Sequence, residues 1–177
     1  MIIQYLEKTS PGVLSFLSLT KIRDIDVILL GGVVSPGIFT LGGGSNVLTA
    51  LNVAGGIAEN GSYRKIEHKR GGETIQVIDL YEIFIFGNID FDQDLQSGDV
   101  LFVHPIQNSI PVSGGVNTQA IFEVLSGETV DDVIKYAGNF SASFDGYKSI
   151  YIKRNDLNSQ QIIDLPVNDS KSFAIKA

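Results

Sequence analysis

The sequence predicts an α+β protein made of two tandem units, and an internal repeat is the main reason. Residues 31–57 read GGVVSPGIFTLGGGSNVLTALNVAGGI, and residues 114–140 read GGVNTQAIFEVLSGETVDDVIKYAGNF. The two stretches align without a gap at a constant offset, as in Phe39 and Phe122 (122 − 39 = 83). The shared positions are mostly apolar residues and glycines. The repeat therefore indicates a unit of structure rather than a catalytic motif.

Composition narrows the classes of function. The chain has 177 residues, which leaves room for two small domains. Its net charge of −7 disfavours nucleic acid and an anionic membrane surface as partners. There is no cysteine, so disulfides, thiolate metal sites and a cysteine nucleophile are excluded. The longest apolar run near the N-terminus, residues 13–19, is too short for a membrane span and lacks the basic flank of a secretion signal.

The first copy begins with a predicted β-hairpin followed by a helix. Strands are expected at residues 26–34 and 38–41, and Pro36-Gly37 between them favours a type II turn. Ser45 or Asn46 then caps a helix that ends at two glycines. Its buried face has apolar residues at helical spacing: Val47, Leu48, Leu51 and Ala54.

The rest of the first copy predicts a mixed sheet. Strands at residues 65–70 and 73–80 flank two glycines, which suggests a second hairpin. A short helical piece within residues 80–86 follows, and Ser97-Gly98-Asp99 leads into a last strand at 100–103. This order, with one helix across the sheet, is a β-grasp (ubiquitin-like) arrangement. The apolar run Ile83–Phe86 cannot all be buried on one face, so part of it is expected to pack on the neighbouring unit or another subunit.

The second copy repeats this pattern but stops early. Thr129 is the predicted cap of its helix, Asp131 and Asp132 follow in the first turn, and the buried stripe comprises Val130, Val133, Ile134 and Ala137. Nothing before residue 177 matches Ser97-Gly98-Asp99 or the closing strand. The expected organisation is an N-terminal strand or linker at 1–25, a first β-grasp unit at 26–107 and a second, incomplete unit at 108–177. We therefore expect a fragment of a longer protein.

Several stretches taken together resemble a known family. GGVVSPGIFTL, NVAGGI, KRGG, IDL and LQSGDVLFV occur in this order and look like the soluble-ligand-binding β-grasp (SLBB) domains of bacterial outer-membrane polysaccharide export proteins. The resemblance covers residues 31–105 well and 110–165 more loosely. The second copy departs from it by having Thr118-Gln119-Ala120 where the first has Ser35-Pro36-Gly37. The signature domain and lipid-anchor cysteine of the export proteins are also missing from the sequence.

The resemblance implies a function without catalysis. It implies a periplasmic module of a capsule or exopolysaccharide export channel at the outer membrane. The partners it implies are further copies in the full-length protein, the polysaccharide and an inner-membrane export protein. The alternative is a β-grasp module that captures a small soluble ligand, which predicts a monomer with one concave apolar pocket. A third possibility, an accessory domain of a redox complex, is disfavoured because no cysteine could ligate a cluster.

Basic and aromatic residues in the same strand region of both copies are the candidate contacts to a glycan or ligand. Charged donors beside aromatic faces suit an acidic sugar chain. Strand alternation would place some of them on one exposed face, although an ordinary solvated strand edge has the same composition. The candidates are Tyr63, Arg64, Lys69, Arg70, Tyr147, Lys153 and Arg154.

Other patterns give no candidate catalytic residue, metal ligand or cofactor. Asp90, Asp92 and Asp94 alternate, but the glycine and glutamate of a calcium loop are absent at the required spacing. A glycine triplet at residues 42–44 is not followed by the lysine of a phosphate loop. His68 and His104 have no obvious partner in the sequence, which favours a structural or surface role for each.

Overall fold

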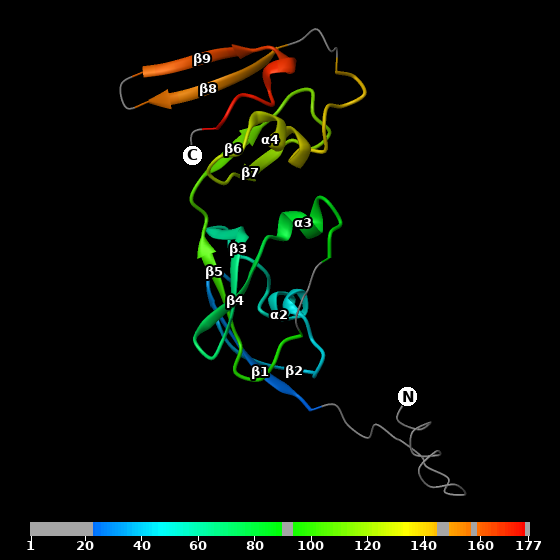
Figure 1. Ribbon diagram of the computed structural model, residues 1–177, viewed down its shortest axis with the longest axis vertical. Coiled ribbons are helices and arrows are strands. Elements are labelled where there is room, and N and C mark those ends of the chain that lie inside the picture. The colour runs from blue at the N-terminus through cyan, green and yellow to red at the C-terminus, as the bar shows by residue number, and fades with distance from the viewer. Residues whose placement is uncertain (1–22, 90–93, 145–148, 157–158, 176–177) are drawn as a thin grey trace, which may run out of the picture.

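The computed structural model describes residues 23–89, 94–144, 149–156 and 159–175. These residues form an α+β protein whose two units follow one another along the long axis (Figure 1). Within the described ranges, no helix is long and apolar enough to cross a lipid bilayer.

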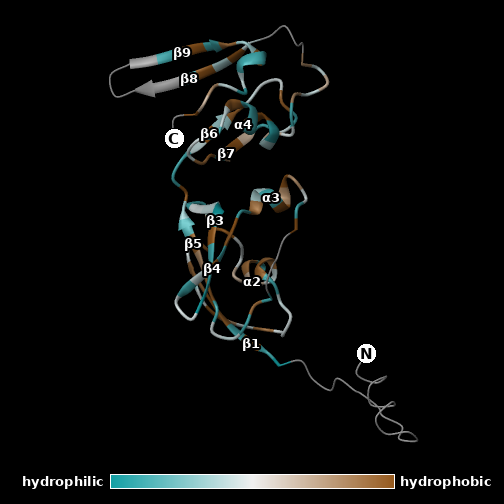
Figure 2. Ribbon diagram, in the orientation of Figure 1, coloured by the Kyte–Doolittle hydropathy of each residue, from teal (hydrophilic) through white to brown (hydrophobic). Residues whose placement is uncertain are grey.

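The first unit is a mixed five-stranded sheet with the strand order β2-β1-β5-β3-β4. Its strands are β1 (Ile25–Gly31), β2 (Gly37–Leu41), β3 (Gly61–Arg70), β4 (Glu73–Ile78) and β5 (Val100–Pro105), and its helices are α2 (Val47–Val53) and α3 (Leu80–Phe84). The predicted element order is therefore confirmed. The central strand β5 runs parallel to β1 and antiparallel to β3. Its Leu101 and Val103 are fully buried in the core beneath α2, where Figure 2 shows hydrophobic residues in the helix and strands.

The predicted type II turn at Pro36-Gly37 is wrong. Strand β1 ends at Gly31, which has a φ of 80°, whereas Gly37 already belongs to β2 and has no positive φ. Val33 instead forms an isolated bridge to Ile57, beyond helix α2. After Gly31 the chain no longer pairs with β2. The bridge to Ile57 and the close contact of the Gly31–Gly32 backbone with β5 hold residues 31–33 in other positions.

The second unit contains two separate hairpins and one helix. Its elements are β6 (Ser109–Val112), β7 (Ala120–Glu123), α4 (Val130–Tyr136), β8 (Ile150–Asp156), β9 (Ser159–Leu165) and the 3₁₀ helix η1 (Val167–Asp169). Thr129 and Asp132 form a capping box at the start of α4, as the sequence predicts for the cap. In the described part of the chain, β6 pairs with β7 and β8 with β9, and no ladder joins the two pairs.

The repeat extends to individual backbone hydrogen bonds. The N–H of Val34 donates to the carbonyl oxygen of Gly56 at 3.0 Å, and the equivalent N–H of Asn117 donates to Asn139 at 3.0 Å. The bridge between Val33 and Ile57 recurs between Val116 and Phe140. The repeated apolar and glycine positions therefore form the same contact in each unit, between the residues that follow the first strand and those that follow the helix.

Candidate functional site

An extensive cluster of polar side chains joins the two units. It lies where β3 and α3 of the first unit meet β7, α4 and the loop between them (Figure 1). We call this cluster the inter-unit junction; it comprises Ser62, Arg64, Asp79, Tyr81, Glu123, Glu128 and Tyr136.

Arg64 is the centre of the inter-unit junction. Its Nε and Nη2 atoms both donate to Asp79 Oδ2 at 3.0 Å, and its Nη1 donates to Glu128 Oε1 at 2.6 Å. The residue is only 8% exposed. One guanidinium thus connects the N-cap of α3 in the first unit with the loop before α4 in the second.

Two tyrosine rings enclose the Arg64 guanidinium. Its Cζ lies 4.8 Å from the ring centroid of Tyr81 and 4.9 Å from that of Tyr136. The two rings contact each other edge to face, with 5.2 Å between centroids. Stacking on aromatic faces and forked hydrogen bonding both suit arginine better than lysine. The inter-unit junction is therefore specific for this side chain.

Glu123 of strand β7 makes a second connection. Its carboxylate accepts hydrogen bonds from Ser62 Oγ at 2.6 Å and from the backbone N–H of Tyr63 at 2.9 Å. Its own N–H donates to the hydroxyl oxygen of Tyr81 at 2.8 Å. Ser62 and Tyr63 lie where the pairing of β3 with β5 is interrupted, between Gly61 and Ile66. The Glu123 carboxylate therefore accepts a hydrogen bond from a backbone N–H at this interruption, that of Tyr63.

Electrostatics keep the inter-unit junction charged at neutral pH. Burial alone would lower the pKa of Arg64, but hydrogen bonds with Asp79 and Glu128 raise it above its ordinary value. The pKa of Tyr136 is also raised, first by burial and then by its hydrogen bond to Glu128. Arg64 therefore stays protonated and positive while Tyr136 stays neutral.

Strand alternation separates the predicted glycan-contact residues. Even-numbered Arg64 shares a side of β3 with the buried Ile66 and lies inside the inter-unit junction, which corrects the expectation of an exposed position. Odd-numbered Tyr63 and Lys69 lie on the opposite, more accessible side. In β8, Lys153 is exposed in the same way, beside Tyr151. Tyr147 and the side chain of Arg154 lie outside the described residues.

The apolar run after β4 packs as expected. Ile83 packs against the core of the first unit, and Tyr81 and Ile85 pack against a core cluster of the second. Phe86 contacts the ring of Tyr136, whereas Phe84 stays 62% exposed. Helix α3 is therefore shared between the two units, which confirms the prediction that part of the run packs on the neighbouring unit.

Both histidines have acidic partners that sequence reasoning missed. His104 lies 3.0 Å from Glu67, which also pairs with Lys69 at 2.6 Å on the accessible side of the sheet. His68 is fully buried, and its Nε2 lies 2.7 Å from Asp99 Oδ2. Sequence reasoning missed these pairs because the partners are far apart in the chain, by 31 residues for His68 and Asp99 and by 37 for His104 and Glu67 (104 − 67 = 37).

Asp99 anchors the turn into β5. It accepts hydrogen bonds from Arg70 Nε at 2.8 Å and from the N–H of Gln96 at 2.8 Å, in addition to its contact with His68. Arg70, a predicted glycan contact, is therefore engaged in this structural cluster. Burial alone would raise the pKa of Asp99, but the hydrogen bonds lower it to about 2.

Acid should destabilise the chain through Asp99. Because its folded-state pKa lies below the ordinary 3.8, its contribution is complete above about pH 4 and is lost as the pH falls toward about 2. This lowering of the pKa corresponds to about 2 kcal/mol of unfolding free energy. We expect Asp99→Asn to be less stable at neutral pH and to lose less stability on acidification, as measured by urea unfolding. An unchanged pH slope would contradict this role.

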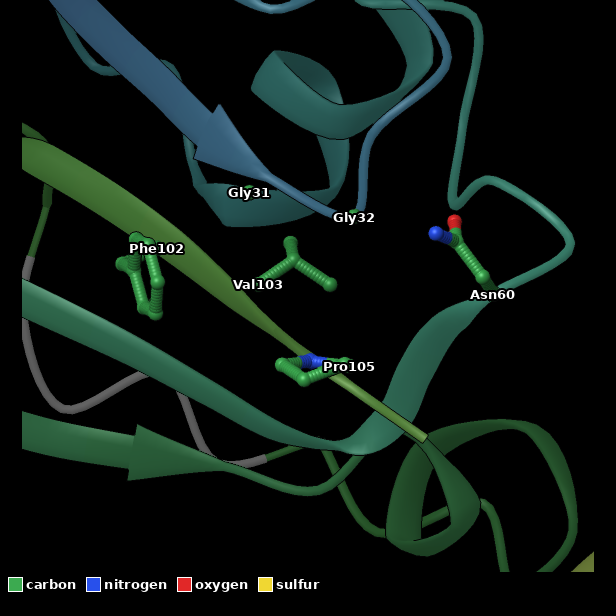
Figure 3. A pocket seen from close by; sticks show the side chains of 6 residues that line it. All are labelled: Gly31, Gly32, Asn60, Phe102, Val103 and Pro105. Atoms are coloured by element: carbon green, nitrogen blue, oxygen red, sulfur yellow. The ribbon is translucent and has the colours of Figure 1, made fainter. Parts of the chain in front are cut away.

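The described ranges contain no candidate metal site and two hollows that could hold a ligand. No group of three or more histidine, aspartate and glutamate side chains there could hold a metal ion. Asp90 and Asp92 lie outside the described residues. One hollow of about 190 Å³ lies between the end of β1 and β5, where Figure 3 shows Asn60 facing Gly32 across from Phe102 and Pro105. A second, of about 460 Å³, lies beside β4 and α3 and is lined in part by Asp79 and Glu82.

Comparison with known families identifies the units. The model of the SLBB domain matches residues 27–79 and residues 110–153, one region in each unit. The chain therefore belongs to the SLBB domain family and carries two SLBB regions in tandem. No curated protein sequence matches the chain.

Proposed function

We propose that the chain is a non-enzymatic, periplasmic part of a capsule or exopolysaccharide export channel, built from two β-grasp units that act as one rigid scaffold. Three observations support this proposal. SLBB domains occur in polysaccharide export proteins. The first unit has a mixed sheet with helix α2 packed against it, an arrangement that fits a β-grasp fold. The two units share a buried, charged junction.

The inter-unit junction is the observation that carries the scaffold role. A flexible tandem would keep a solvated linker between independent domains, whereas here a buried arginine, two aromatic rings and a buried glutamate cross from one unit to the other. A channel wall that must hold its diameter needs this fixed spacing between neighbouring modules. Export also implies self-association of the full-length protein and contact with an inner-membrane export partner.

Contact with the glycan is assigned to the accessible side of β3 and β8. Tyr63 and Lys69 lie there in the first unit, and Tyr151 and Lys153 in the second. Lys69 lies 5.8 Å from the ring centroid of Phe102, so an aromatic surface adjoins the charge. Such surfaces bind acidic sugars weakly, and binding gains strength when many copies act together.

Titration with sugars tests the glycan assignment. Isotope-labelled protein would be titrated with a uronic-acid oligosaccharide and with a neutral glucose oligosaccharide, and chemical shifts followed. We expect shifts from the acidic sugar that cluster on Tyr63, Lys69 and Lys153, and their loss in a Lys69→Gln/Lys153→Gln double variant. Lys135→Gln, which removes an ion-paired lysine on α4, is the matched control. Equal loss in the control, or no shifts with either sugar, would contradict glycan contact.

Capture of a small molecule is the second candidate. The hollow beside β4 and α3, of about 460 Å³, is within the usual size range of small-molecule sites, whereas the hollow of about 190 Å³ is below it. A small-molecule ligand would shift the signals of Val77, Ile78 and Ile83, which line the larger hollow, and leave those of Lys69 and Lys153 unchanged. The position of the shifted signals therefore separates the two candidates.

A further inference from the structure

The larger hollow lies along the free edge of the sheet in the first unit. Strand β4 is the last in the order β2-β1-β5-β3-β4, and in the described ranges it pairs with β3 alone. Four consecutive residues, Gln76–Asp79, line the hollow. Because alternate side chains of a strand point to opposite faces of its sheet, a hollow lined by consecutive residues runs beside the strand rather than over one face. Glu82, Ile83 and Asn88 form the rest of its wall, and we call this hollow the edge groove.

The edge of β4 beside the groove is open to another strand. An edge strand turns one set of its backbone N–H and C=O groups to solvent, and natural proteins commonly block such an edge with lysine or proline. Strand β4 contains neither residue. A bulge at Ile75, which the ladder to β3 skips, limits the regular edge to Gln76–Ile78. There the side chain of Val77 is 58% exposed, so free hydrogen-bonding groups and an apolar contact occur together.

The charges of the edge groove favour a positively charged ligand. Its charged side chains are Asp79 and Glu82, and no basic side chain of the described residues lines it. Asp79 is already engaged, because its two oxygens accept hydrogen bonds from Arg64 and from the N–H of Tyr81. Exposed Glu82 accepts a hydrogen bond from Asn88 Nδ2 at 2.8 Å. The other oxygen of Glu82 is the carboxylate group available for a charge-assisted hydrogen bond with a ligand.

We infer that the edge groove binds an extended segment of a partner protein, which pairs with β4 and carries an arginine or lysine for Glu82 between apolar residues that contact Val77 and Ile83. Strand addition of this kind draws its affinity from main-chain hydrogen bonds and its specificity from alternate side chains. The edge belongs to the five-stranded sheet, whose central strand β5 is in place. In the second unit Leu165 matches Leu80 (165 − 80 = 85), and Val167 stands where the first unit has Glu82 (167 − 82 = 85). The acidic wall is therefore particular to the first unit.

A short synthetic peptide tests the inference. The probe is the acetylated and amidated peptide Thr-Val-Arg-Val-Thr, titrated into the isotope-labelled chain. We expect saturable chemical shift changes and slower amide exchange at Gln76–Ile78, and weaker binding at higher salt because the attraction to Glu82 is screened. The absence of saturable binding at millimolar peptide, or shifts confined to β8 and β9, would overturn the inference.

Two altered peptides separate the contributions of charge and backbone. Replacing the arginine of the peptide by glutamate should weaken binding at least about tenfold, because its carboxylate would face that of Glu82. A peptide with every amide nitrogen methylated keeps the side chains but cannot donate to β4, and it should not bind. A small molecule in the same hollow would need no such donors. Equal binding of either altered peptide would therefore overturn strand addition.

A pair of glutamate variants locates the binding site on the protein. Glu82→Gln removes the carboxylate from the edge groove, and we expect at least about tenfold weaker binding of the arginine peptide. Glu59→Gln makes the same change of charge at an exposed residue that does not line the groove, and it should bind the peptide normally. Equal affinity of the two variants would contradict the assigned site. The inference does not depend on the proposed export function, whose sugar titration reports on Lys69 and Lys153 instead.

Discussion

Replacing Arg64 by alanine should cost about 3 kcal/mol or more of unfolding free energy, because it leaves the Asp79 and Glu128 carboxylates without their buried partner. It also removes the cation from between two tyrosine rings. Since these contacts cross between the units, we expect the native chain to unfold in one urea transition and the Arg64→Ala variant to unfold in two. Equilibrium unfolding followed by fluorescence and by circular dichroism would measure both effects.

The neighbouring lysine provides the control for this variant. Lys65 is exposed on the opposite side of β3, so Lys65→Ala should change the stability by less than about 0.5 kcal/mol. Arg64→Lys keeps the charge but loses the forked geometry, and an intermediate cost is expected. If Arg64→Ala were as stable as Lys65→Ala, the inter-unit junction would not hold the units together.

The Gly31→Ala substitution adds one methyl group and should strongly lower the stability of the first unit. Its φ of 80° disfavours any side chain, and the new Cβ would lie 2.1 Å from the carbonyl oxygen of Val103. Strand β5 would have to shift, which disrupts its pairing with both neighbours. We expect a loss of about 3 kcal/mol or more, measured by urea unfolding.

The repeat supplies a matched variant at the equivalent position. Gly114→Ala carries the same backbone cost without a clash, so it should lose only about 1 kcal/mol. The difference between the two variants isolates the effect of a neighbouring central strand. Equal losses would contradict the close packing of Gly31 against β5.

The element order could be read from the sequence because each signal is local. The capping box at Thr129 and Asp132, and the glycines after each helix, act within one turn of the chain. The hairpin-and-helix pattern of each copy is weak alone. Its recurrence at a constant offset made the prediction of two similar units strong. The turn at Pro36-Gly37 was predicted wrongly because a contact between Val33 and Ile57, across the helix, overrides the local preference.

The candidate site was harder to predict because its residues come from both units. Arg64 was singled out as a basic residue in a strand, but its partners Asp79 and Glu128 lie 15 and 64 residues further along the chain. Residue type alone does not distinguish a buried arginine from an exposed one. Alternation along β3, with Ile66 buried, was the available signal that Arg64 and Lys69 face opposite sides.

Residual dipolar couplings test the central claim, that the two SLBB units form one rigid body. Backbone couplings would be measured on the native chain in a weakly aligning medium, and an alignment tensor fitted to each unit separately. The inter-unit junction predicts one common tensor for both units, and two tensors in Arg64→Ala. Different tensors in the native chain would mean that the units move independently, which would contradict the scaffold proposed here.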